Sequence, residues 1–177
     1  MNIFKKISLR IIKRISPVKY AKKIGVNFGN NLHIYGNVNW STEPWIITIG
    51  ENVFITDGCK FITHDGGTLL FRKQVPDLEI TKPIIIGNNV YFGNNVIVLP
   101  GVTIGNNVII GAGSVVTKSI PDNVVVAGVP AKIIKSIDEY FKKVNSESIH
   151  LGHLKGKNKD DALKKYYRFS KQNTKKH

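Results

Sequence analysis

Large apolar residues recur every six positions through the middle of the chain, and a smaller residue, usually Val, follows each of them four places later. The first positions of the clearest steps are Ile86, Phe92, Val98, Ile104, Ile110 and Val116. Glycine or asparagine fills most of the places between. Such a short fixed period is typical of a solenoid, in which each unit buries its apolar face against its neighbours. Gly and Asn favour positive-φ turns, so the pattern predicts an all-β solenoid, a parallel β-helix.

The length of the steps predicts how they stack, because three of them make about one turn of a three-sided coil. Ile86 is expected to stack on Ile104, and Phe92 on Ile110, since each pair is 18 residues apart. The same template extends back through Phe28, Ile34, Ile49, Ile55 and Phe61. The predicted coil therefore covers residues 28–131.

Two interruptions break the spacing before Ile86. The interval from Phe28 to Ile49 is 21 residues, three more than one turn, which predicts a short insertion around residues 40–47. The interval from Ile49 to Ile86 is 37 residues, 19 more than one turn, which predicts an excursion from the coil wall at about residues 67–85. Insertions at solenoid corners often carry the binding surface, so this excursion is the first place to look for function.

Charge divides the chain into three segments. Residues 1–27 hold eight Lys or Arg and no acid, residues 132–177 hold thirteen against five acids, and residues 28–131 hold five against seven. The net charge of +14 therefore belongs to the two ends. Because the predicted coil is slightly acidic, the charge does not indicate a nucleic-acid partner.

The first segment, residues 1–27, reads as a basic amphipathic helix, because Ile and Phe recur at helical spacing between Lys and Arg. Pro17 is expected to end or kink this helix. Charges interrupt every apolar stretch, so the sequence predicts neither a signal peptide nor a membrane span. Residues 1–20 either contact the inner face of a membrane peripherally or pack on a partner subunit or the open end of the coil.

The last segment, residues 132–177, is expected to contain a helix over Ile133–Val144 and a polar basic tail with a short helix near residues 160–169. The single cysteine, Cys59, has no partner for an internal disulfide and takes an inward, small-residue place of the repeat. We therefore expect a buried thiol and a cytoplasmic protein.

Six motifs follow one another in a characteristic order. They are Ile-Thr-Ile-Gly-Glu-Asn-Val (47–53), Thr-His-Asp-Gly-Gly (63–67), Ile-Gly-Asn-Asn-Val-Tyr-Phe-Gly (86–93), Leu-Pro-Gly-Val-Thr-Ile-Gly (99–105), Ile-Gly-Ala-Gly-Ser-Val-Val-Thr-Lys (110–118) and Val-Ala-Gly-Val-Pro-Ala-Lys (126–132). Through them, residues 28–135 resemble the hexapeptide-repeat acyltransferases, above all the sugar and polysaccharide O-acetyltransferases. The resemblance implies a left-handed parallel β-helix, acetyl-CoA as co-substrate, and a homotrimer with active sites between subunits.

Acetyl transfer from a thioester to a hydroxyl needs a base that takes the hydroxyl proton, and imidazole suits this near neutral pH. The resemblance implies that the base is the histidine before the excursion, which matches His64. A turn position should face His64 outward, which also fits an ordinary solvated residue. His33 faces outward too but has no excursion beside it. Asp65 either orients the imidazole, holds a substrate hydroxyl or makes the turn before Gly66.

The resemblance also assigns a binding track for acetyl-CoA. Asn94 and Ala112 are 18 residues apart and so take equivalent places on successive turns. The implied cofactor-binding residues are Asn94, Ala112, Thr117, Lys118, Lys132 and Lys135. The first four would line the pantetheine arm and the last two would meet the nucleotide phosphates, although ordinary turn and surface roles are the alternatives.

Aromatic and polar residues near the short insertion suit a glycan acceptor. Aromatic rings can stack on sugar faces while neighbouring side chains bond the hydroxyls. The candidate substrate-binding residues are Asn37, Trp40 and Glu43, together with Asp65. Trp40 and Trp45 would equally cap the coil or fill a subunit contact.

The leading hypothesis is an acetyl-CoA-dependent O-acetyltransferase that acts on a sugar hydroxyl in surface polysaccharide (capsule or O-antigen) synthesis. Transfer would be direct, since Cys59 faces inward. An N-acetyltransferase of an amino-sugar nucleotide and a non-catalytic membrane-surface scaffold remain the alternatives. A metal-dependent hydratase on this coil would need three histidine ligands, and His64 stands alone between residues 34 and 149, so no metal is predicted.

Overall fold

The computed structural model describes residues 9 and 11–169 of the 177-residue chain. Contacts divide the chain into two compact units, Met1–Tyr140 and Phe141–His177, and the first of them contains the coil. The apolar positions predicted in residues 1–8 lie outside the described residues. The N-terminal helix is therefore tested only from Ile11 onward.

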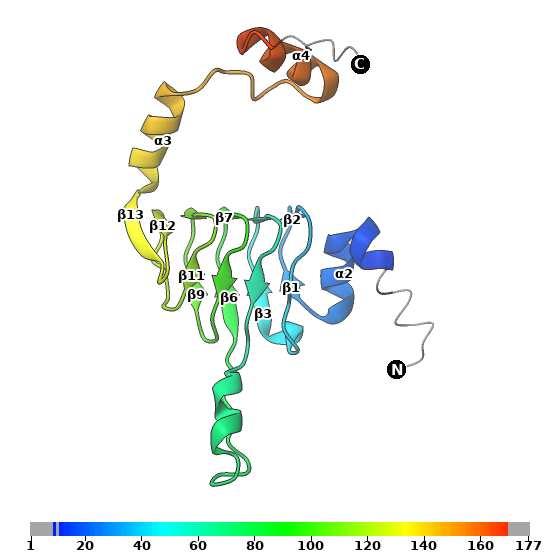
Figure 1. Ribbon diagram of the computed structural model, residues 1–177, viewed down its shortest axis with the longest axis vertical. Coiled ribbons are helices and arrows are strands. Elements are labelled where there is room, and N and C mark those ends of the chain that lie inside the picture. The colour runs from blue at the N-terminus through cyan, green and yellow to red at the C-terminus, as the bar shows by residue number, and fades with distance from the viewer. Residues whose placement is uncertain (1–8, 10, 170–177) are drawn as a thin grey trace, which may run out of the picture. The chain divides into compact units, whose positions relative to one another are not determined.

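Short strands in the first unit wind into three sheets (Figure 1), and from residue 47 to residue 116 the chain visits them in the order A, B, C on each turn. Sheet A contains β1 (Asn27–Phe28), β3 (Ile47–Ile49), β6 (Ile84–Ile86) and β9 (Thr103–Ile104). Sheet B contains β2 (His33–Ile34), β4 (Phe54–Ile55), β7 (Val90–Phe92), β10 (Val108–Ile110), β12 (Val124–Ala127) and β13 (Lys132–Ser136). Sheet C contains β5 (Lys60–Phe61), β8 (Ile97–Val98) and β11 (Val115–Val116). This winding is the predicted three-sided coil.

The strands stack in parallel with the predicted register. Ile86 pairs with Ile104, and Phe92 pairs with Ile110. β1 pairs with β3 across the short insertion, and β3 pairs with β6 across the excursion. Both insertions therefore leave the coil wall and rejoin it without shifting the inward face.

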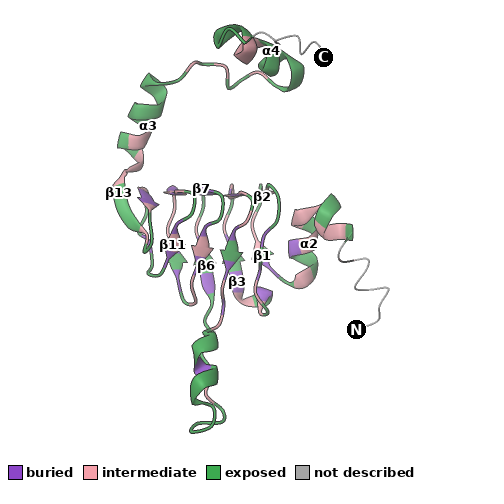
Figure 2. Cartoon of the chain, viewed as in Figure 1, coloured by how far each residue is buried: buried purple, intermediate pink, exposed green. Residues whose placement is uncertain are grey.

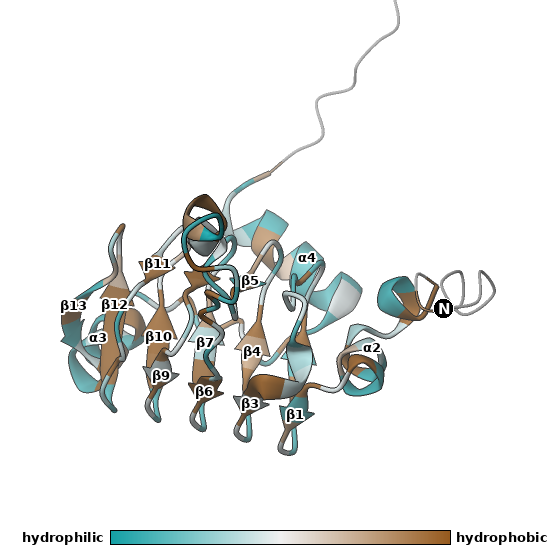
Figure 3. Ribbon diagram, turned by 90° about the horizontal axis from the view of Figure 1, so that it is seen from below, coloured by the Kyte–Doolittle hydropathy of each residue, from teal (hydrophilic) through white to brown (hydrophobic). Residues whose placement is uncertain are grey.

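Alternate strand residues are buried, as the purple segments of the strands show, and together they form one apolar core (Figure 2). The largest fully buried side chains include Phe61, Phe92, Ile47, Ile49, Ile55, Ile84, Ile86, Ile104 and Ile110. Burial of each contributes about 1.5–3 kcal/mol. Many strands are accordingly hydrophobic in colour, whereas the corners between them are largely hydrophilic (Figure 3).

Cys59 lies in this core, as predicted. It is 1 % exposed, and its Sγ lies 3.3 Å from the carbonyl oxygen of Gly93, to which the thiol donates. Burial raises the pKa of the Cys59 thiol. The thiol is therefore a structural part of the core.

One corner of the coil is built by a ladder of asparagine side chains. Its members are Asn31, Asn52, Asn89, Asn107 and Asn123, all with φ between 55° and 62°. The amide nitrogen of each of the first four donates to the amide oxygen of the next asparagine at 2.8–3.0 Å. Asparagine tolerates this left-handed conformation better than most residues. The ladder therefore supplies the backbone conformation that the turns need and pairs the side-chain amides with one another.

The N-terminal helical segment is interrupted at Pro17, as expected. Residues 11–15 are helical, Ser16 breaks the helix, and α2 (Pro17–Ile24) follows with Pro17 at its first position. α2 contacts β2 and η1 (Pro44–Ile46), and Ala21 is fully buried. The helix therefore packs on the open end of the coil. No helix within residues 11–169 is both long and apolar enough to cross a membrane.

The helix predicted over Ile133–Val144 begins four residues later, so this prediction was wrong at its start. Residues 132–136 form β13, which pairs antiparallel with β12 and continues sheet B, and α3 (Ile137–Ser146) follows. The β-branched pair Ile133–Ile134 suits a strand, and the free edge of β12 offers it a partner. In the second unit, α4 (Gly156–Tyr166) starts before the predicted residue 160.

The long excursion leaves the wall after β5 and returns at β6, projecting away from the coil (Figure 1). It contains η2 (Gly66–Phe71), a 3-10 helix that the repeat pattern does not predict. Its base is closed by hydrogen bonds from Asp65 N to Ile80 O at 2.9 Å and from Lys82 N to Thr63 O at 2.8 Å. The excursion thus spans about residues 65–83, two residues earlier than predicted at each end.

Candidate active site

His64 lies at the corner where the chain leaves sheet C for the excursion. Its backbone bridges to Thr81 at the base of the excursion. Its side chain is 37 % exposed, and Nδ1 lies 3.0 Å from Oε2 of Glu43. The excursion therefore fixes the backbone of His64, and a carboxylate fixes its ring.

Glu43 comes from the short insertion, directly before η1. Thr42 Oγ1 donates to its Oε1 at 2.6 Å, and Thr63 Oγ1 donates to its Oε2 at 2.6 Å. These hydrogen bonds, from Thr42 first and then Thr63, together with the contact to His64, lower the pKa of Glu43 from 4.5 to about 2. The carboxylate is consequently ionised at neutral pH.

An ionised carboxylate can only accept a hydrogen bond, so Nδ1 of His64 carries the hydrogen and donates it to Glu43. The hydroxyls of Ser41 and Thr42 lie 3.4 Å and 3.2 Å from the same nitrogen. With Nδ1 protonated, the neutral imidazole has its lone pair on Nε2. This is the tautomer that a general base needs.

A cavity of about 460 Å³ adjoins His64. Its lining residues are Ile62, His64, Asp65, Gly66, Ile80, Lys82, Leu99, Pro100 and Thr117. Residues from three turns of the coil and from the excursion thus lie together beside the imidazole. Of the predicted cofactor-binding residues, Thr117 lies in this cavity.

Asn94 and Ala112 stack at the corner between sheets B and C, both exposed. Gly113 N donates to Asn94 O at 2.7 Å, and a Cβ at Gly93 would lie 2.5 Å from Ala112 N, so the two turns are in close contact. The positive φ of this turn belongs to Asn95, not to Asn94. Asn94 therefore keeps an exposed side chain that the turn itself does not use.

The predicted lysines lie on segments that follow Ala112 in the chain. Lys118 follows β11 and is exposed, while Lys132 and Lys135 lie on β13. Ala131 N donates to Val115 O at 2.8 Å, which places Lys132 directly after a residue beside sheet C. None of the three lysines lines the cavity at His64.

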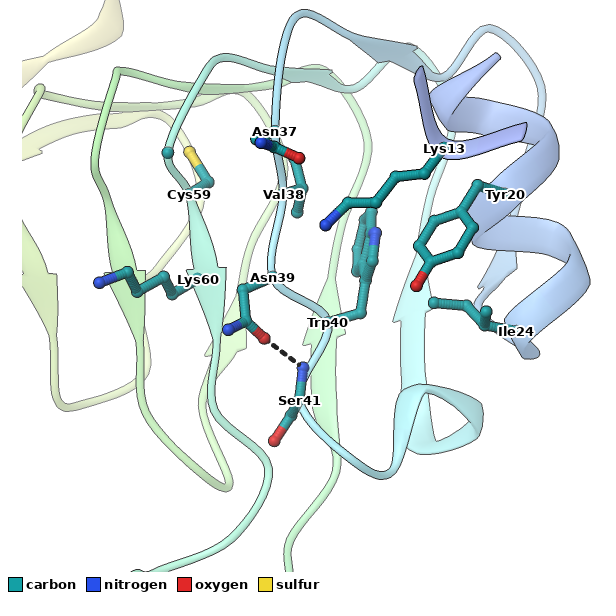
Figure 4. A pocket seen from close by; sticks show the side chains of 11 residues that line it. Lys13, Tyr20, Ile24, Asn37, Val38, Asn39, Trp40, Ser41, Cys59 and Lys60 are labelled. Carbon is teal, nitrogen blue, oxygen red and sulfur yellow. Dashed lines mark hydrogen bonds between the residues drawn. The ribbon is translucent and has the colours of Figure 1, made fainter. Parts of the chain in front are cut away.

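The predicted substrate-binding residues separate into two groups. Glu43 bonds His64, and Asp65 both lines the cavity and accepts the Gly67 N–H at 2.9 Å as the cap of η2. Trp40 is 4 % exposed and stacks on Phe61, with ring centroids 5.1 Å apart, so its ring packs in the core. Asn37 and Trp40 instead line a second cavity (Figure 4).

Sequence reasoning missed the contact between Glu43 and His64 and the supporting hydroxyls of Thr42 and Thr63. A signal for it was available, because Glu43 and His64 are 21 residues apart. That is the same interval that separates paired residues of β1 and β3. Within the described residues, no group of three or more His, Cys, Asp or Glu side chains is arranged to hold a metal ion.

Residues 83–118 match the family model described as bacterial transferase hexapeptide (six repeats). Protein CapG of Staphylococcus aureus is 48 % identical over 142 residues, which cover 79 % of this chain and 83 % of CapG. Galactoside O-acetyltransferase of Escherichia coli is 41 % identical over 132 residues, which cover 69 % of this chain and 64 % of that protein.

Solved structures show the same architecture. A maltose O-acetyltransferase from Clostridium difficile superposes with a TM-score of 0.57 at 26 % identity, covering 75 % of this chain and 84 % of its own. A galactoside acetyltransferase in complex with coenzyme A superposes with a TM-score of 0.53 at 31 % identity, covering 78 % and 82 %.

Proposed function

We propose a sugar O-acetyltransferase activity, on the premise that this chain belongs to the hexapeptide-repeat acyltransferases and is an acetyltransferase that uses acetyl-CoA. The observation that carries the proposal is the hydrogen bond between Glu43 and His64 at the rim of a 460 Å³ cavity. The similarity to galactoside and maltose O-acetyltransferases favours a hydroxyl acceptor over an amine. The coil would be left-handed, as the family resemblance implies.

In the proposed reaction, Nε2 of His64 takes the proton of the acceptor hydroxyl as its oxygen attacks the thioester carbonyl carbon. The carbon–sulfur bond then breaks, and the imidazolium returns the proton to the departing thiolate of CoA. Glu43 holds the ring and stabilises its positive charge between these two steps. Base catalysis of this kind contributes about 10²–10⁴-fold to the rate.

The acetyl-CoA track would cross the outer face of sheet C. Asn94 and Ala112 lie at one corner of this sheet, and Thr117 and Lys118 follow β11 at the other. The absence of a side chain at Gly93 lets these turns pack closely. Lys132 and Lys135 would attract the nucleotide phosphates as point charges.

We further propose that the working form is a homotrimer. Outward residues of sheet C such as Ile97 and Val115 are only partly exposed, whereas Leu70 and Phe71 of the excursion are 82 % and 52 % exposed. The exposed apolar side chains of Leu70 and Phe71 would suit a contact with another subunit. Light scattering on the purified chain should give three times its 19.7 kDa mass, and a monomer mass would exclude the trimer.

Two finer proposals concern the cell. The acceptor would belong to a surface polysaccharide or its precursor, so deletion of the protein should remove O-acetyl signals from the NMR spectrum of that polysaccharide.

Peripheral membrane contact would use Ile11 and Ile15, which are 51 % and 79 % exposed beside Arg14. Flotation with anionic liposomes, comparing the full chain with one lacking residues 1–20, tests this contact.

The decisive experiment measures release of free thiol from acetyl-CoA with a panel of sugars and the matching amino sugars. His64→Ala should lose at least a hundredfold in kcat while retaining CoA binding. His33→Ala should leave kcat unchanged. Unchanged turnover in His64→Ala would refute the base. Faster transfer to amino sugars than to sugars would instead establish an N-acetyltransferase.

A further inference from the structure

A second cavity, of about 330 Å³, lies between the N-terminal helical segment and the first turns of the coil (Figure 4). Lys13 and Tyr20 line it from the helical side. Asn37, Asn39 and Lys60 line it from the coil, with the edge of Trp40 between the two sides. Its polar lining is rich in hydrogen-bond donors.

The charge of this cavity is positive. Lys13 Nζ lies 5.7 Å from the centre of the Tyr20 ring, a cation–π distance that holds the ammonium at the rim. Lys60 is exposed, and no carboxylate lines the cavity. Neither lysine forms a salt bridge with any residue in the described part of the chain.

The carboxylate on the neighbouring turn is already engaged. Asp57 accepts the Asn37 N–H at 2.6 Å and does not line the cavity. An adjoining cavity of about 310 Å³ shares Lys13 and Asn37 and adds Arg14. Lys13 therefore borders both cavities, Lys60 lines the first and Arg14 the second, and no carboxylate from the described residues lines either of them.

The amides add directed donors. Asn39 Oδ1 accepts the Ser41 N–H at 2.9 Å, which leaves the Asn39 Nδ2 hydrogens for a ligand. The Asn37 side chain and the Tyr20 hydroxyl make no hydrogen bond among the described residues. A ligand that presents several acceptor oxygens and a negative charge would satisfy this set.

The cavity is coupled to the proposed active site by position. Ser41 lines the cavity, and its Oγ lies 3.4 Å from Nδ1 of His64. Asn39 forms a parallel β-bridge with Lys60, and this pairing continues sheet C towards the N-terminal end of the coil. The proposed acetyl-CoA track uses the later turns of the same sheet. The cavity therefore borders the early turns of sheet C, and the proposed acetyl-CoA track lies on its later turns.

From this geometry we infer that the cavity binds an anionic group, a phosphate or a carboxylate, of the acceptor glycan. The inference rests on the proposed acetyltransferase function and narrows its substrate class to acidic sugars or sugar phosphates. His64 lies four residues after Lys60, about 13 Å along an extended chain. The anionic group and the acetylated hydroxyl of an acceptor would therefore lie along the same short stretch of the coil.

The test compares four acceptors at fixed acetyl-CoA: methyl glucoside, glucuronic acid, glucose 1-phosphate and UDP-glucose. At least one anionic acceptor should exceed the neutral one tenfold in kcat/KM. Lys13→Gln and Lys60→Gln should each raise the KM for that acceptor about tenfold, without changing the KM for acetyl-CoA. Lys23→Gln, an exposed residue of α2 that lines no described cavity, is the matched control. Preference for glucuronic acid or for the phosphates identifies the anion.

Equal use of neutral and anionic acceptors, or unchanged KM values in both lysine variants, would overturn the inference and leave the acetyltransferase proposal intact. Absence of CoA release with every acceptor would instead count against that proposal. Calorimetric titration of the full chain with the same anionic compounds then decides the inference by itself. Binding that the double variant Lys13→Gln/Lys60→Gln loses supports it, and absence of binding to the unmodified chain refutes it.

Discussion

Glu43→Gln isolates the charge that we propose to assist His64. Glutamine has nearly the same shape, and its amide oxygen can still accept from Nδ1 of His64 and from the buried Thr63 hydroxyl. Its amide nitrogen would face Thr42, whose exposed hydroxyl can turn to accept. The ring therefore keeps its tautomer and position, and only the negative charge is lost.

The size of the effect follows from the 3.0 Å contact. Two unit charges at that distance interact by about 1.4 kcal/mol at the dielectric constant of water and about 5.5 kcal/mol at an effective value of 20. The two side chains are 37 % and 25 % exposed, so solvent screening favours the lower part of this range. We expect a loss of about 2 kcal/mol of transition-state stabilisation, or about 30-fold in kcat.

Glu43→Ala should cost more, because it removes the orientation of the ring as well as the charge. It also leaves the Thr63 hydroxyl buried without its acceptor, which should lower the free energy of unfolding by about 1–3 kcal/mol. The glutamine variant keeps an acceptor for Thr63 and should therefore lose less stability at pH 7 than the alanine variant. The two variants thus separate a catalytic effect from a structural one.

Steady-state kinetics with acetyl-CoA and the best acceptor provide the assay. Glu43→Gln should lower kcat while leaving both KM values within twofold, and it should add nothing in the His64→Ala background, because the carboxylate acts through the imidazole. A kcat within twofold of the unmodified enzyme, with normal CoA binding, would refute the role of the charge. An equal loss in the presence and absence of His64 would show that Glu43 acts independently.

Acid unfolding provides a second readout of the same carboxylate. The pKa of Glu43 is about 2 in the folded protein against 4.5 ordinarily, so its stabilising effect is fully present above about pH 4.5. The effect is lost as the pH falls towards 2. The difference in unfolding free energy between the unmodified protein and Glu43→Gln should therefore shrink over this window.

Gly93→Ala would place a Cβ 2.5 Å from the backbone nitrogen of Ala112 and should cost about 3 kcal/mol in unfolding free energy, whereas Gly66→Ala, whose Cβ meets no atom within 4 Å, should melt normally. Asn89→Ala breaks two ladder hydrogen bonds at a residue with φ 56°, so chemical denaturation should show a loss of about 2–3 kcal/mol, and Asn89→Gly should recover the backbone part. Cys59 should resist iodoacetamide at pH 8, because burial raises its pKa, and Cys59→Ala should retain turnover; rapid labelling or lost transfer would contradict this.

The coil could be predicted from sequence because its period repeats in both core and turn residues. Inward residues such as Phe92 and Ile110 and left-handed asparagines such as Asn89 recur at fixed intervals. Each interval identifies the residue that stacks on a given position in the next turn. Helix periodicity was a poorer guide at residues 133–136. Apolar side chains there met an unpaired edge of sheet B, and backbone pairing with that edge decided the conformation.

The site was only half predictable because each insertion was considered by itself. Asn39 bridges to Lys60 on sheet C, and both β3 and β6 belong to sheet A. The short insertion and the excursion therefore leave the coil at the same corner, on consecutive turns. Two segments that depart from one corner of stacked turns must lie side by side, so Glu43 of the first meets His64 of the second. In a solenoid, interruptions obey the same stacking as the repeat, and residues one turn apart in two interruptions are the pair to examine first for catalysis.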